Sequence, residues 1–280
     1  MNAVERARPG LARAERLRAT APSPMRALKL RGLATWAVAG LLLYPARALA
    51  GPPFVTDDPE PIEHRHWELY LASQTVHDRD GWSGTAPHFE ANYGVVPNVQ
   101  LHVIAPFAYF AATRGSTHYG YGDMELGAKI RFVREGAWVP QIGTYPMLEA
   151  PTGSQRDGLG NGSAQVFLPI WLQKSFGEWT TYGGPGLWMD VGHGDRRSWY
   201  FGWELQRRIV EHLSLGAEVF YLTPKEPGDE HDLRFNVGAI IDVNDSHHFL
   251  VSAGRGLVGP TSFQGYFAYL VTLGPSCPEP

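Results

Sequence analysis

Nine charged residues occupy alternate positions in segments that are otherwise apolar or aromatic. Glu68, for example, lies between Trp67 and Leu69, so in an extended chain it points away from both. Charged groups that leave bulk water must be paired or stay hydrated. They therefore form either a paired or hydrated interior that maintains the fold, or a lining that screens solutes by charge. The nine are Glu68, Glu90, Glu125, Lys129, Arg131, Glu204, Glu218, Arg234 and Asp242.

Aromatic residues share the face that carries these charges. Trp171 and Tyr200 are the two that we assign to a lumen lining, and Phe167, Phe220 and Tyr266 have the same alternation. Aromatic faces can stack on a ring-bearing solute, and they can also simply fill volume. A mixed aromatic and charged lining would suit an aromatic or amphipathic solute.

Residue types typical of catalysis or metal binding occur in weak patterns only. Ser198, His193 and Asp190 could meet around one loop, which makes them the best candidates for a lipid hydrolase. His64 and His66 lie among acidic residues, and we expect solvated side chains there rather than a metal ligand set. We assign no catalytic residue, no metal and no cofactor.

Period-two alternation along the chain indicates the elements that position these residues. In residues 165–174, Val166, Leu168, Ile170 and Leu172 share one face, as in a strand. Twelve such arms follow one another, separated by connections that are alternately short (97–98, 134–136, 175–177, 210–212, 244–246) and longer (77–85, 111–120, 151–162, 191–197, 224–231). The pattern predicts an all-β fold, an antiparallel transmembrane β-barrel of about 12 strands with short periplasmic turns and longer extracellular loops. A soluble sandwich is the alternative.

Residues 1–50 have the features of a signal peptide with an over-extended N-terminus, and Met25 is a possible true start. A basic region precedes a short apolar run, and Ala48-Leu49-Ala50 fits a signal peptidase site. We then expect a Pro- and acid-rich periplasmic or plug segment (51–65), a barrel (66–274) and a C-terminal tail (275–280). The location would be the outer membrane of a Gram-negative cell, where barrel-assembly machinery would insert the chain.

Charge excludes some functions. The first fifty residues hold 9 of the 24 basic and 2 of the 28 acidic residues, which leaves a net charge of −11 for the rest. Nucleic-acid binding requires a basic surface, so it is excluded as a function. Cys277 is the only cysteine and cannot form an intramolecular disulfide. After residue 50, no stretch of eighteen apolar residues could form a spanning helix.

Three motifs resemble a known family. They are residues 51–61 with His66-Trp67-Glu68; Tyr121-Gly122-Asp123 with Glu125, Leu126, Gly127 and Lys129; and residues 158–162 with Pro169, Lys174, Tyr182, Gly183 and Gly184. The chain is similar there to the outer-membrane proteins named for the meta-pathway of phenol degradation. The resemblance implies an outer-membrane barrel, often labelled a transporter and associated with aromatic compounds. The chain ends in 275–280 without the terminal aromatic residue typical of such barrels.

These observations favour an outer-membrane channel or transporter for small hydrophobic or aromatic solutes. Its partners would be outer-membrane lipid and a small-molecule solute. A lipid-modifying barrel enzyme and a structural or adhesin-like barrel are the alternatives. Four prolines and four carboxylates keep residues 51–63 from forming a strand, so we expect this segment to be a partial plug, a periplasmic gate or a disordered leader.

Overall fold

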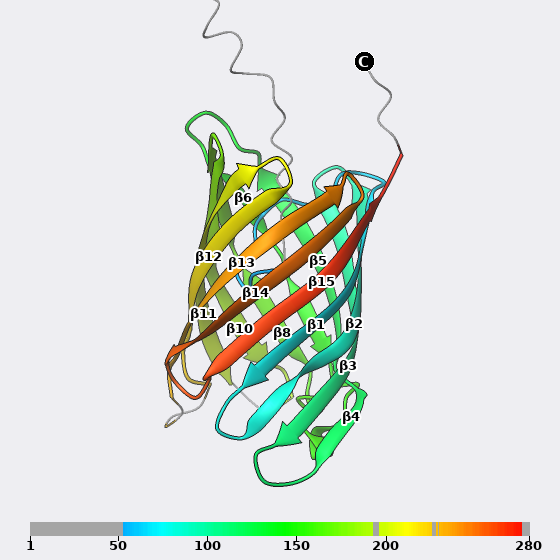
Figure 1. Ribbon diagram of the computed structural model, residues 1–280, viewed down its shortest axis with the longest axis vertical. Coiled ribbons are helices and arrows are strands. Elements are labelled where there is room, and N and C mark those ends of the chain that lie inside the picture. Colours follow the sequence, from blue (N-terminus) through cyan, green and yellow to red (C-terminus); the bar gives the residue numbers. More distant parts are fainter. Residues whose placement is uncertain (1–52, 193–195, 226–227, 229, 276–280) are drawn as a thin grey trace, which may run out of the picture. The chain divides into compact units, whose positions relative to one another are not determined.

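The computed structural model describes residues 53–192, 196–225, 228 and 230–275. The first fifty residues, and with them the predicted signal peptide, lie outside the described residues. Figure 1 shows strands running side by side around a central space. Within the described ranges the one helical element is a short 3₁₀ turn, Gln155–Asp157, and no helix is long and apolar enough to cross a membrane.

The strands pair as antiparallel neighbours, and the first closes onto the last. Trp67 pairs with Leu273 and His77 with Phe263, so β1 and β15 are joined along their whole length. In chain order the strands are β1 (Trp67–His77), β2 (Gly81–Val96), β3 (Val99–Ala112), β4 (Thr117–Tyr121), β5 (Met124–Val133), β6 (Gln141–Thr144), β7 (Met147–Ala150), β8 (Gln165–Pro169), β9 (Trp171–Phe176), β10 (Trp179–Asp190), β11 (Arg197–Val210), β12 (Leu213–Leu222), β13 (Asp232–Asn244), β14 (His247–Val258) and β15 (Phe263–Leu273).

Three of the twelve arms of the barrel are interrupted. β4 continues as β5, β6 as β7, and β8 as β9, while the other nine strands are continuous. Pro146 lies in one interruption and Pro169 beside another, and proline cannot donate a ladder hydrogen bond. Backbone bonds span these points, from Ala128 N–H to Pro146 O (3.1 Å) and from Ile170 N–H to Pro185 O (2.9 Å). The closed antiparallel barrel of twelve strands predicted from the sequence is confirmed.

Two of the predicted longer connections are short in the structure. Residues 77–85 and 111–120 were expected to be loops, but β2 begins at Gly81 and β3 ends at Ala112, so the connections are 78–80 and 113–116. The polar and glycine residues there still pair across β2 and β3, from Gly81 with Ala112 to Thr85 with Ala108. Backbone pairing needs no apolar face, so these strands continue where alternation has ended. In Figure 1, β2, β3 and β4 extend beyond the other strands at this end. At the opposite end of the barrel, the connection between β5 and β6 comprises residues 134–140 and is longer than the predicted 134–136.

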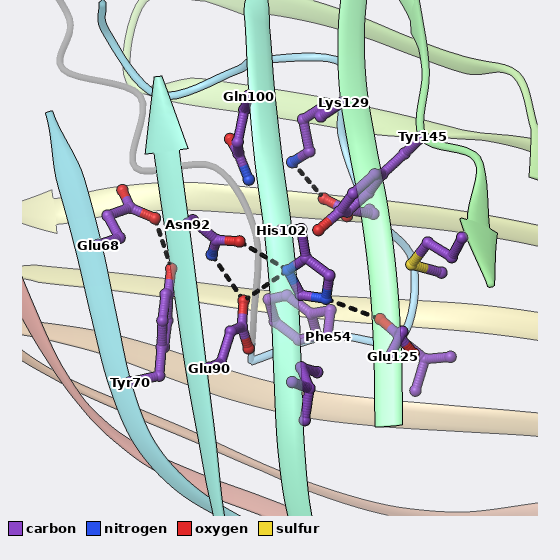
Figure 2. A pocket seen from close by; sticks show the side chains of 14 residues that line it. Phe54, Glu68, Tyr70, Glu90, Asn92, Gln100, His102, Glu125, Lys129 and Tyr145 are labelled. Atoms are coloured by element: carbon purple, nitrogen blue, oxygen red, sulfur yellow. Dashed lines mark hydrogen bonds and ion pairs between the residues drawn. The ribbon is translucent and has the colours of Figure 1, made fainter. Parts of the chain in front are cut away.

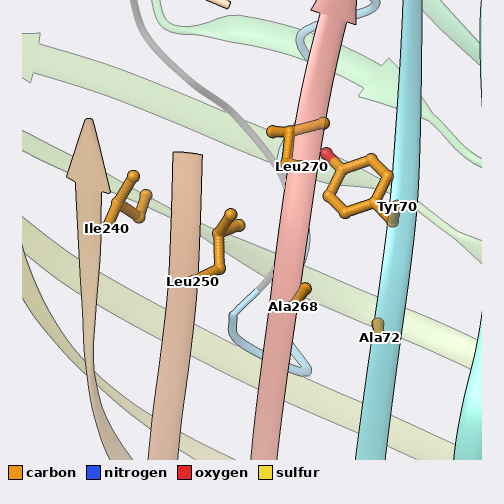
Figure 3. Packing of buried hydrophobic residues seen from close by; sticks show 6 residues of the cluster. All are labelled: Tyr70, Ala72, Ile240, Leu250, Ala268 and Leu270. Atoms are coloured by element: carbon orange, nitrogen blue, oxygen red, sulfur yellow. The ribbon is translucent and has the colours of Figure 1, made fainter. Parts of the chain in front are cut away.

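The strands are apolar outside and polar inside. Along β11, Trp199, Phe201, Trp203 and Leu205 are exposed, whereas Ser198, Tyr200 and Glu204 are buried. A soluble protein has the opposite arrangement. One buried apolar cluster inside the barrel, drawn in Figure 3, joins four strands through Tyr70, Ala72, Ile240, Leu250, Ala268 and Leu270. The exposed apolar belt matches a lipid-facing surface.

Candidate functional site

The segment before β1 lies inside the barrel. Phe54 is 9% exposed and its ring lies over Gly216 and Gly238, which pair in the register of β12 and β13. A Cβ atom at Gly216 would come within 2.8 Å of this ring, and one at Gly238 within 3.0 Å. Ser252 Oγ, on the next strand, donates to Pro53 O at 2.5 Å. The wall therefore has a recess, formed by missing side chains, in which Phe54 is seated.

Glu218 fixes the backbone of the same segment. Its carboxylate accepts hydrogen bonds from Val55 N–H (2.9 Å) and Thr56 N–H (2.8 Å), and Asn236 Nδ2 also donates to it. Thr56 Oγ1 lies 2.8 Å from the hydroxyl of Tyr200. Because Thr56 and Glu218 are buried, these bonds satisfy groups that would otherwise be costly to remove from water.

The acidic residues of the segment meet the cations of β5. Lys129 Nζ lies 2.9 Å from Asp57 Oδ1 and 3.7 Å from Asp58 Oδ2. Arg131 pairs with Glu60 and also donates to Asn98 Oδ1. Burial raises the pKa of Asp58 well above its usual range, and the charge of Lys129 opposes that rise.

Beside the segment lies a cavity of about 130 Å³ within the lumen. Figure 2 shows side chains that line it, with Glu68 on β1, Glu90 on β2, and Glu125 and Lys129 on β5. The segment contributes Phe54, Val55 and Asp57; the barrel contributes Glu68, Tyr70, Glu90, Asn92, Gln100, His102, Ile104, Glu125, Lys129, Tyr145 and Met147. The cavity therefore offers aromatic and apolar surface together with charges of both signs.

His102 connects the acidic side of the cavity. Its Nδ1 lies 2.6 Å from Asn92 Oδ1 and its Nε2 lies 2.8 Å from Glu125 Oε1. Asn92 Nδ2 donates in turn to Glu90 at 2.7 Å. In a separate contact, the Tyr70 hydroxyl donates to Glu68 at 2.8 Å. These carboxylates thus have hydrogen-bond partners in the wall itself.

The structure divides the lining residues predicted from sequence among several places. Glu68, Glu90, Glu125 and Lys129 border the cavity. Arg131 is not among the lining residues and pairs with Glu60. Glu204 and Glu218 are buried and directly opposite each other on β11 and β12. Arg234 pairs with Asp232, and Asp242 with His248. Trp171 and Tyr200 pack in a second buried aromatic cluster with Phe167, Phe220 and Tyr145.

The sequence reasoning missed His102, Asn92, Gln100 and Tyr145 as lining residues. The first three alternate with outward apolar residues, which is the same signal that selected Glu90 and Lys129. They are polar side chains without a formal charge, whereas the prediction rests on charged residues and on Trp and Tyr. Tyr145 lies in the interruption between β6 and β7, where alternation gives no guidance.

The structure describes two of the three candidate hydrolase residues, Ser198 and Asp190. Ser198 is 2% exposed, and its Oγ has no hydrogen-bond partner in the part of the chain that the structure describes. Asp190 accepts a hydrogen bond from Ser163 Oγ at 2.7 Å. His193 lies outside the described residues. His66 Nδ1 contacts His64 O at 3.2 Å, and no cluster of three His, Cys, Asp or Glu in the described ranges could hold a metal ion.

Comparison with solved structures gives barrels of similar fold. An outer membrane channel from Pseudomonas putida F1 has a TM-score of 0.58 and 16% identity, covering 80% of this chain and 99% of that chain. The KdgM porin has a TM-score of 0.49 and 12% identity, over 75% and 99% of the two chains. The CymD monoaromatic hydrocarbon channel has 0.42 and 10%, over 76% and 89%. No family model matches the chain, and neither does any curated protein. At this identity the similarity shows the barrel fold alone.

Proposed function

We propose that this chain forms a channel in the bacterial outer membrane through which small hydrophobic or aromatic solutes pass. The observation that carries the proposal is the lumen cavity, enclosed by a barrel with an apolar exterior. Tyr70, Tyr145, Phe54 and Met147 give it surface for a ring, and charged residues surround that surface. A route of this kind would accept a solute that combines a flat apolar part with a polar group.

The sequence resemblance to the phenol meta-pathway family supports an aromatic solute. The exposed belt of large apolar side chains supports a location in lipid. The pairing of β1 with β15 supports it as well, because an open sheet edge cannot be left in lipid. In this proposal the outer-membrane lipid and the barrel-assembly machinery are the partners of the chain, and the turns at 97–98, 211–212 and 245–246 face the periplasm.

We further propose that residues 53–63 act as a plug of this channel. They lie in the lumen and are held there by three sets of contacts. Phe54 packs on the wall, Glu218 accepts hydrogen bonds from the backbone of the segment, and the two cations of β5 pair with its acidic residues. Solute passage would then require the segment to move aside or to leave room along the cavity.

Single-channel recording of the purified chain in a planar bilayer tests the channel proposal. We expect small conductance steps, and partial block when phenol is added to one side. A parallel assay would measure phenol entry into vesicles with and without the inserted protein. If neither ions nor phenol cross through correctly inserted protein, the channel proposal is wrong.

A further inference from the structure

Two cations inside the barrel have their carboxylate partners on the plug segment. Lys129 is 4% exposed and pairs with Asp57 and Asp58, and Arg131 pairs with Glu60. These three acidic residues lie within four positions of one another. Among the described residues, no ion pair links either cation to a carboxylate of the barrel wall.

The nearby wall groups are either neutral or already engaged. Arg131 donates to the amide oxygens of Asn98 and Gln141. Glu125 and Glu90 are bonded to His102 and Asn92. Glu68, on β1, is bonded to the Tyr70 hydroxyl and acts electrostatically on Lys129, but it forms no ion pair with it. Among the described residues, the carboxylates within ion-pair distance of Lys129 and Arg131 all belong to the segment.

Removing the segment would leave two cations without their ion-pair partners in a confined space. A buried charge that loses its partner is strongly unfavourable, and water alone compensates only in part. The least costly replacement is another carboxylate, which can accept charge-assisted hydrogen bonds from ammonium and guanidinium groups. The segment can therefore be exchanged most readily for an anion of the same chemistry.

The segment presents an aromatic ring together with its acids. Phe54 and Asp57 line the same cavity, and Lys129 Nζ lies 5.0 Å from the ring centroid of Tyr145. A ligand with a ring and a carboxylate would meet an aromatic surface and a cation at the same place.

We propose that Lys129 and Arg131 form a binding site for the carboxylate of an aromatic acid, and that Asp57 and Glu60 occupy this site as an internal competitor. This inference deepens the proposed function, on which it rests: the solute class becomes aromatic carboxylates, and solute binding displaces the plug. Phe54 occupies the place of the solute's ring in the resting state.

The test measures binding of phenylacetate to the full chain folded in detergent, by titration calorimetry, with the neutral isostere phenylacetamide alongside. Lys129→Gln and Arg131→Gln should each weaken phenylacetate binding by about tenfold or more, since each removes a charge-assisted hydrogen bond. Asp57→Asn and Glu60→Gln should strengthen it, because the competitor is weakened. Glu63→Gln is the matched control, since this side chain is 79% exposed, and it should leave binding unchanged.

Hydrogen exchange at Val55 and Thr56 reports segment release independently, because both amides are bonded to Glu218. The two wall variants (Lys129→Gln, Arg131→Gln) and the two segment variants (Asp57→Asn, Glu60→Gln) should all speed this exchange. The wall variants should nevertheless lower phenylacetate affinity, and the segment variants should raise it. A merely structural role would move affinity in the same direction for all four. If a wall variant does not fold, the two segment variants still test the sign.

The result separates this inference from the channel proposal. Equal binding of phenylacetate and phenylacetamide, or unchanged affinity in Lys129→Gln and Arg131→Gln, would overturn the carboxylate site even where the protein conducts. Charge-dependent phenylacetate binding by a protein that passes neither ions nor phenol would uphold the site and refute the channel.

Discussion

Phe54 is held in the lumen largely by what the wall lacks. Its ring occupies space that side chains at Gly216 and Gly238 would fill. Docking of this kind depends on the contact area of the ring. Removing the ring of Phe54 should therefore weaken docking of the segment more than shortening the side chain of Val55. The segment is thereby seated by shape at one end and by charge at the other.

Phe54→Ala should therefore loosen the docked segment. Loss of this apolar burial costs about 2 kcal/mol of docking free energy, which predicts faster hydrogen exchange at residues 55–56 and more frequent channel opening. Val55→Ala is the matched control, because Val55 is 52% exposed and loses little contact. Equal effects of the two variants would contradict a seat for Phe54.

Glu218 should be a second anchor of the segment. Glu218→Gln replaces one acceptor of the carboxylate by a donor that faces the Val55 or Thr56 N–H, which costs about 1–3 kcal/mol. Exchange at these amides should become faster. Glu204→Gln alters the buried acid directly across the strand pair, which bonds neither amide. This control should leave their exchange as in the parent chain.

Residue alternation was sufficient to predict most strands but few of the contacts. β11 and β12 follow the apolar and polar faces expected from their sequences. The lumen contacts join distant positions, such as Asp57 with Lys129 and His102 with Glu125. Which inward residues meet depends on the stagger of neighbouring strands and on the path of 53–63, and the local pattern contains neither.

At the scale of elements, the interruptions and extensions of strands were harder to predict from the sequence than the strands themselves. The pairing of Gly81–Thr85 with β3 is set by the partner strand, so alternation could not reveal it. β6 and β7 are four residues each, which is too short for a periodic signal. Pro146 and Pro169 lie at or beside two of these breaks, but a proline does not show whether an arm remains paired on both sides of it.

If residues 53–63 plug the channel, their deletion should change its conductance but not the fold of the barrel. Deletion of residues 53–63 should leave the twelve arms intact, since β1 pairs with β2 and β15 without it. Conductance should rise because the lumen loses Phe54, Val55 and Asp57. Heat-modifiable gel migration would verify correct folding, and a well-folded deletion variant with unchanged conductance would refute the plug.

At the scale of the whole molecule, the two surfaces of the wall are chemically opposite. The exterior is apolar, while the lumen contains most of the charged side chains of the strands, from Glu68 to Asp242. Pairing between β1 and β15 leaves no open sheet edge. Together these features require surroundings that accept apolar side chains. This requirement can be tested by placing a charged residue on the exterior at different depths in the bilayer.

Val237 and Val243 provide a matched pair for that test, since both lie on β13 and both are 56% exposed. Val237 is midway along the strand and pairs with Ala217 and Ala253, whereas Val243 lies near its end. An arginine on a lipid-facing surface costs about 2–4 kcal/mol at the bilayer midplane and about 0–1 kcal/mol near the interface. Val237→Arg should accordingly lower the folded fraction in lipid vesicles, measured by heat-modifiable migration across a urea series, and Val243→Arg should have a small effect. Equal folded fractions for both variants and the parent chain would mean that this surface does not face lipid.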